Sequence, residues 1–234
     1  MSTAAEVTGF RHFHDQLALL KQRLLDMSTK AESLVDLSVE AVLGRDRGKA
    51  EAVIAADHEL DALEIEVEGL AVSLLALQQP LARDLRFIVG AIKISSDLER
   101  VGDHAVNIAE ATIRLLDATP SPVITPQPEI EEMAKRARKM LGDALDAFIR
   151  ADGTLGRDVC GADDQVDAMN ESVFRILLTH MMENPANISQ AIQLLLVGRN
   201  LERVADLATN IGEDAVYLAE GKTIKHHFEE RHGR

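Results

Sequence analysis

Two stretches of the sequence carry the same spacing of carboxylate and amide side chains. Residues 98–110 read LERVGDHAVNIAE and residues 201–213 read LERVADLATNIGE, with nine of thirteen positions identical. Each stretch places two acids and an asparagine at i, i+4 and i+8, which fall within one stripe of an α-helix. Oxygen ligands without thiolates suit Mg²⁺, Mn²⁺, Ca²⁺ or iron. The predicted metal ligands are Glu99, Asp103 and Asn107 in the first stretch and Glu202, Asp206 and Asn210 in the second.

A simpler interpretation is that each acidic stripe is the solvent-exposed face of an amphipathic helix. Like charges at i, i+4 cost roughly 0.2–0.5 kcal/mol per pair, however, so a doubled stripe is mildly unfavourable without a cation. Further acids at the same spacing precede each stretch, and stripes on neighbouring helices can converge on one oxygen site. These additional candidate ligands are Asp57 and Asp61 in the first half and Asp163 and Asp167 in the second.

Other residues that could do chemistry give no coherent signature. His104 lies beside the first stripe, but Leu207 has the equivalent place in the second, so we expect a neighbour rather than a required ligand. Cys160 is expected in a turn and without a role. The sequence contains no P-loop, nucleophile elbow or His-Glu-x-x-His motif. We therefore predict a protein that is not an enzyme, with a carboxylate-rich helical metalloenzyme and a metal-independent helical adaptor as the alternatives.

The elements that carry these residues are predicted to be six long helices. Apolar residues recur at helical spacing throughout, whereas Pro80 and Pro185 interrupt the pattern at equivalent places in the two halves. The repeated features are offset by 103 to 106 residues, which indicates an internal duplication. The expected fold is all-α, with two tandem three-helix bundles. The expected helices are 10–43, 49–78, 82–117, 129–150, 159–183 and 187–220.

The predicted domain organisation follows from the duplication and the prolines. Residues 1–118 form the first repeat, residues 119–128 a linker with four of the six prolines, residues 129–221 the second repeat, and residues 222–234 a polar tail. A helix cannot continue through so many prolines. Residues 1–9 are expected to be an irregular start.

Composition limits the classes of partner. The formal charge of −14 disfavours nucleic acid and anionic membrane surfaces, and the single cysteine excludes a disulfide scaffold. Apolar residues make up 46% of the chain, but no run approaches the length of a membrane span, and we expect no signal segment. We expect a soluble, cytoplasmic protein that binds no nucleic acid and is not inserted in a membrane.

The stretch from Gln79 to Glu110, QPLARDLRFIVGAIKISSDLERVGDHAVNIAE, resembles the signature of the PhoU family of bacterial phosphate-uptake regulators. The doubled Glu-x-x-x-Asp motif, the two three-helix repeats and the length agree with a PhoU-like six-helix fold. The second repeat departs from the first at several positions, so we do not expect the two halves to bind metal equally. Those departures are Asn170, Phe174, Leu207 and Gly212.

This resemblance implies a negative regulator of the phosphate-starvation response and of phosphate uptake. Its implied partners are the ATPase of the ABC phosphate transporter and a phosphate-sensing histidine kinase, so that the protein reaches the inner face of the membrane through them. The resemblance also implies a homodimer and multinuclear iron or zinc clusters on the acidic motifs.

Overall fold

The computed structural model describes residues 4–78, 80–117 and 127–224, and all regular structure within these ranges is helical. The first three helices are α1 (Ala4–Gly44), α2 (Arg47–Gln78) and α3 (Ala82–Asp117). The next three are α4 (Gln127–Arg150), α5 (Gly153–Glu183) and α6 (Ile188–Glu220), with a 3₁₀ turn, η1 (Pro185–Asn187), between the last two. The predicted all-α fold with six long helices is confirmed.

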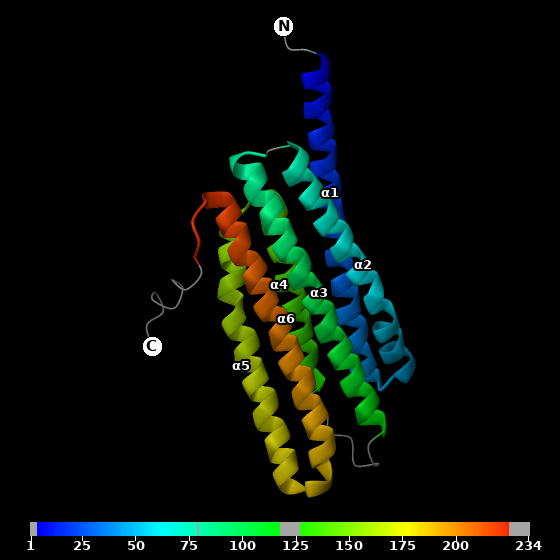
Figure 1. The fold of residues 1–234 in the computed structure, drawn as a ribbon. Helices are drawn as coiled ribbons and strands as arrows, with labels where there is room; N and C mark the ends of the chain where they lie inside the picture. Colours follow the sequence, from blue (N-terminus) through cyan, green and yellow to red (C-terminus); the bar gives the residue numbers. More distant parts are fainter. Residues whose placement is uncertain (1–3, 79, 118–126, 225–234) are drawn as a thin grey trace.

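Each set of three helices packs as an antiparallel bundle, and the two bundles lie side by side. Helices α3 and α6 run along each other at the centre of the molecule, and α1 contacts α4 (Figure 1). The α2–α3 connection lies at one end of the molecule and the α5–α6 connection at the other (Figure 1). One continuous core of Leu, Ile, Val, Ala and Met, with a few Phe, runs through both bundles. The duplicated halves therefore share a single hydrophobic core.

Aromatic packing marks the junction between the two halves. Phe148 of α4 is completely buried and stacks on Phe87 of α3, with 5.0 Å between ring centroids. A Cβ atom at Gly90 would lie 2.6 Å from the Phe148 ring, so glycine at this position of α3 leaves the space that the ring fills. Lys21 of α1 also contacts this pair, because its Nζ lies 5.1 Å from the centroid of the Phe87 ring. Two of the chain's few aromatic residues therefore join the repeats.

Several helix ends differ from the predicted ones. Helix α1 begins at Ala4, so residues 4–9 are helical rather than irregular. Helix α4 begins at Gln127, within the predicted linker, because proline at position 128 is tolerated in a first helical turn. The rest of the predicted linker, residues 119–126, lies outside the described residues, as do residues 225–234 of the predicted tail.

Helix α5 also begins six residues earlier than predicted, at Gly153. Asp152 caps this helix by accepting hydrogen bonds from the backbone N–H groups of Thr154 and Leu155 at 3.0 and 3.1 Å. Cys160 consequently lies inside α5 and is buried, so the expectation that it occupies a turn is wrong. Helix α6 ends at Glu220, and the next residue, Gly221, caps it with a φ of 69° in the left-handed region.

Candidate metal-binding clusters

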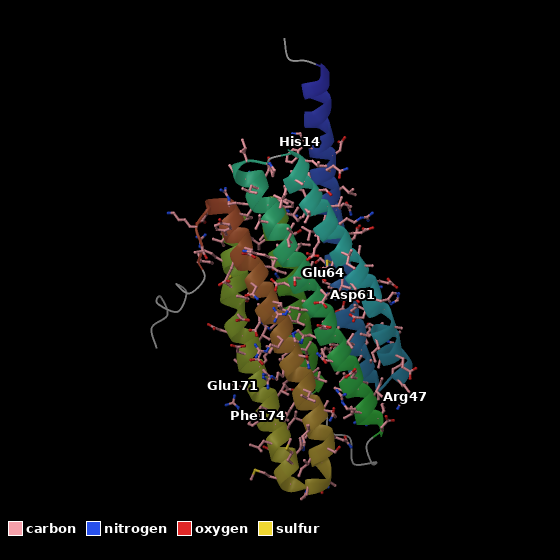
Figure 2. The ribbon with its side chains drawn as sticks, viewed as in Figure 1. His14, Arg47, Asp61, Glu64, Glu171 and Phe174 are labelled. Atoms are coloured by element: carbon pink, nitrogen blue, oxygen red, sulfur yellow. The ribbon has the colours of Figure 1, made fainter. Side chains whose placement is uncertain are left out.

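The predicted carboxylates of the first repeat meet between α2 and α3. We define the first cluster as Asp57, Asp61 and Glu64 of α2 with Glu99 and Asp103 of α3. Burial raises the pKa of Glu99 to about 7, and the negative charges of the other four members add to this effect. Figure 2 shows Asp61 and Glu64 about one turn apart on α2. The acids of α2 therefore lie close enough to Glu99 to interact with it electrostatically.

Close contact between the two helices positions this cluster. A Cβ atom at Gly102 would lie 2.5 Å from the Leu60 side chain and 3.0 Å from Asp57 Oδ1. Glycine at this position thus allows Leu60 and Asp57 to lie directly against α3, next to Asp103. Burial also raises the pKa of Asp57, with further contributions from Asp61 and Asp103. The packing of Leu60 and Asp57 against Gly102 therefore brings like charges close together.

The carboxylates of the second repeat meet in the same way between α5 and α6. We define the second cluster as Asp163 and Asp167 of α5 with Glu202 and Asp206 of α6. Burial raises the pKa of Asp163 to about 6, with contributions from the other three members. One oxygen of Asp163, Oδ1, is buried and has no hydrogen-bond donor among the described residues. Buried carboxylate oxygens are normally satisfied by a donor or a cation.

The two clusters are not equivalent in charge. In the second, Asn170 replaces the acid Glu64 and donates a hydrogen bond from Nδ2 to Glu202 Oε2 at 2.9 Å. Arg203 Nη1 donates to Asp206 Oδ2 at 2.9 Å. In the first, the corresponding Arg100 pairs instead with Asp97, outside the cluster, at 3.7 Å. The first cluster therefore holds more uncompensated negative charge.

Other predicted candidates stay outside the clusters. Asn107 is exposed and Asn210 half-buried, and among the described residues neither is hydrogen-bonded to a cluster carboxylate. His104 Nδ1 lies 2.9 Å from Oδ1 of Asn200, so this ring is directed to the seam between α3 and α6. This contact accords with the expectation that His104 is a neighbour of the stripe.

The donor chemistry of both clusters fits a hard cation, but the side chains are not preassembled around one. Glu99 in the first cluster and Asp163 in the second have raised pKa values, and one buried oxygen of Asp163 lacks a donor, as expected of groups that a cation would neutralise. Within the described residues, however, no group of three or more His, Cys, Asp or Glu side chains is arranged so that it could hold a metal ion. Ligation would thus require rotamer changes along the stripes.

Comparison with known proteins places the whole arrangement in a family. The model of the PhoU domain matches residues 24–112 and again residues 130–215. The chain belongs to the PhoU family. A "Phosphate-specific transport system accessory protein PhoU homolog" from Caulobacter vibrioides is 41% identical over 203 residues, which cover 87% of each chain.

Two solved structures of the PhoU family share the fold. The crystal structure of PhoU from Pseudomonas aeruginosa has a TM-score of 0.84 and 35% identity, covering 90% of this chain and all of that one. The phosphate transport system regulatory protein PhoU from Streptococcus pneumoniae has a TM-score of 0.83 and 28% identity, covering 91% of this chain and 99% of that one.

Family membership confirms two predictions. The six-helix fold with two PhoU repeats is the expected one, and the PhoU family consists of accessory and regulatory proteins rather than enzymes. A carboxylate-rich metalloenzyme is accordingly set aside. None of the helices in the described ranges combines the length and the apolar character needed to cross a membrane.

Proposed function

We propose that this protein is a negative regulator of phosphate uptake and of the phosphate-starvation response that acts by contact. Its proposed partners are the ATPase of an ABC phosphate transporter and a phosphate-sensing histidine kinase, which it reaches from the cytoplasm as a homodimer. Relatives that match this chain over most of their own length are named as accessory or regulatory proteins of phosphate transport. This likeness, over nearly the whole chain, is the observation that carries the proposal.

The shape of the molecule supports action by binding. Its six helices have 24 to 41 residues, and a 33-residue helix such as α6 is about 50 Å long. Long exposed helix faces offer an extended surface to a partner. The cluster carboxylates Glu99 and Asp163 have raised pKa values because of burial and the charges of other acids, which suits cation or partner binding better than catalysis.

The proposal includes metal binding at the two clusters. Glu99 and Asp103 would hold a cation in the first cluster, and Glu202 and Asp206 in the second, with Asp57, Asp61, Asp163 and Asp167 from the facing helices. Asn107 and Asn210 are retained as outer candidates. Iron or zinc is the expected metal, with manganese or magnesium as the other oxygen-binding choices. A bound cation would neutralise the acids and give this face positive groups toward a partner.

Metal binding is tested by equilibrium dialysis with Fe, Zn, Mn and Mg separately. We expect the wild type to retain at least one of these metals and the Glu99→Ala/Asp103→Ala/Glu202→Ala/Asp206→Ala variant to retain none. Equal retention by a correctly folded variant would contradict the proposed ligands. The quadruple variant should fold, because removal of clustered like charges relieves repulsion.

The regulatory function is tested separately by deleting the gene. The deletion strain should express phosphate-starvation genes in high phosphate, and the wild-type gene should restore repression. Purified protein should also bind the purified transporter ATPase or the cytoplasmic part of the kinase. Normal repression in the deletion strain, with no binding to either protein, would refute the regulatory proposal. It would leave the metal-binding result unaffected.

A further inference from the structure

The second repeat presents two rows of exposed apolar side chains that the first repeat interrupts. On α5 they are Phe174, Leu178 and Met182, and on α6 they are Ile188, Ile192 and Leu196. Each row has the spacing i, i+4, i+8 and so extends about 12 Å along its helix. Phe174 is 52% exposed and Met182 79%, which are unusual values for large apolar side chains that serve only the core.

The ends of the two rows that lie nearest the second cluster line a groove. Phe174 of α5 and Ile192, Leu195 and Leu196 of α6 line a hollow of about 500 Å³ between the helices, and Arg199 borders it. Glu202 also lines this hollow, so the groove adjoins the second cluster. Figure 2 shows Phe174 and Glu171 on the part of α5 that lies away from the first repeat. We call this hollow the α5–α6 groove.

The duplication provides an internal comparison for the groove. The offsets of 106 and 103 residues place Glu68 at the position of Phe174 and Lys93 at the position of Leu196. Charged residues thus end both apolar rows in the first repeat, and that bundle still packs with the same three-helix fold. The fold itself does not require Phe174 or Leu196 to be apolar. Their apolar character in the second repeat therefore points to a contact outside the bundle.

The charges around the groove indicate what it receives. Arg175 and Arg199 lie on the exposed faces beside it, and Arg203, which is paired with Asp206, borders it, although the protein as a whole has a charge of −14. Their first-repeat counterparts include Gly69 and Ser96, so the second repeat has gained two arginines at this place. Arginine beside an apolar groove favours a partner that places carboxylates next to its apolar residues.

We propose that the α5–α6 groove binds an amphipathic helix of a partner protein that carries acidic residues beside its apolar face. A helix presents apolar side chains at i, i+3, i+4 and i+7, which matches a groove between two antiparallel helices. An anionic membrane would meet the same arginines, but the apolar side chains line a hollow between two helices, which a single helix can enter and a flat membrane surface cannot. The inference rests on the proposed function in that it identifies the kind of segment through which a partner is contacted.

The test uses two fluorescent synthetic peptides of 18 residues with identical leucines at helical spacing. One carries glutamates beside the leucines and the other carries lysines. Fluorescence anisotropy with the wild-type protein should show at least about tenfold tighter binding of the glutamate peptide. Phe174→Glu, which installs the first-repeat residue, and Ile192→Ser should each weaken this binding at least about tenfold.

Two further variants separate the groove from general surface effects. Val89 has the place of Ile192 in the first repeat and is similarly exposed, so Val89→Ser should change the affinity by less than about twofold. Arg199→Glu should reverse the preference between the two peptides. Circular dichroism and thermal unfolding would verify that each variant is folded.

Several outcomes would overturn the inference. The first is that the wild-type protein does not bind the glutamate peptide at a protein concentration of about 1 mM. The second is that Val89→Ser weakens binding of this peptide as much as Ile192→Ser does. The third is that the wild-type protein binds the two peptides equally well. Preferential binding to phosphatidylglycerol vesicles that Phe174→Glu abolishes would assign the groove to a membrane instead. A loss of self-association in Phe174→Glu, measured by light scattering, would assign it to a second copy. These assays use no phosphate-dependent readout, so their failure is distinguishable from failure of the regulatory function.

Discussion

Replacing Glu99 by glutamine should stabilise the metal-free protein at alkaline pH. The pKa of this carboxyl group rises from 4.5 to about 7, first because of burial and then because of Asp103, Glu64, Asp61 and Asp57. Its protonated form therefore stabilises the fold below about pH 4.5, and this stabilisation is lost as the pH rises through about 7. Glutamine has nearly the same shape and no charge to lose.

The magnitude follows from the difference in pKa. At about 1.36 kcal/mol per pH unit, the shift corresponds to at most about 3.4 kcal/mol. Glu99 is only half-buried, and water and salt screen its repulsion by the neighbouring acids. We therefore expect Glu99→Gln to increase the free energy of unfolding by about 1 kcal/mol at pH 8. The increase should fall toward zero near pH 4.5.

Urea denaturation in the presence of a chelator, at pH values from 4.5 to 8 and low ionic strength, measures this effect. Glu110→Gln provides a matched control, because Glu110 lies on the same helix but pairs with Arg114 outside the cluster. Glu110→Gln should lower the free energy of unfolding by less than about 0.5 kcal/mol, and this change should depend little on pH between 6 and 8. If Glu99→Gln were no more stable than the wild type at pH 8, the repulsion inferred for the first cluster would be wrong.

Three other substitutions or measurements examine the packing and the remaining perturbed groups. Gly212→Ala should cost about 1–3 kcal/mol in thermal or urea unfolding, because its Cβ would lie 2.9 Å from the Gly156 carbonyl oxygen. The control Gly161→Ala, with open space around its Cβ, should instead stabilise by up to about 1 kcal/mol. Burial, with smaller contributions from Glu213 and Asp163, raises the pKa of Cys160 to about 12, so a thiol reagent at pH 8 should modify it only after unfolding. Rapid labelling of the native protein would contradict this burial. Arg157→Ala should cost less than about 1 kcal/mol, and less still in 1 M salt, because its paired contact with Glu220 is exposed.

Helix existence could be predicted from the sequence, because long apolar periodicity and Pro80 and Pro185 leave few alternatives. The start of α5 could not. Gly153, Gly156 and Gly161 give this segment a poor helix propensity, and the sequence does not reveal what compensates. In the structure, Gly156 and Gly212 let the backbones of α5 and α6 approach closely, so tertiary packing outweighs propensity.

The acidic clusters could be predicted in part. Periodicity placed Glu99 and Asp103 on one stripe, and the duplication indicated which acids on the preceding helices share their site. Periodicity does not show which side chain donates to which, so the Asn170–Glu202 hydrogen bond and the outward position of Asn107 emerge only from the structure. Periodicity does not indicate the groove either, because it does not show which exposed apolar side chains line a hollow. The difference between Phe174 and Glu68 is the signal of it that the sequence contains.

The stacking of Phe148 on Phe87 has a consequence for how the chain unfolds. Because Phe148 belongs to the second repeat and its ring is buried against Gly90 and Phe87 of the first, separating the repeats would expose apolar surface on both. A half-molecule ending at the linker would lose the side chain that fills the space over Gly90. The duplicated halves should thus melt together in one cooperative transition, as a single thermodynamic unit built from two copies of one ancestral segment.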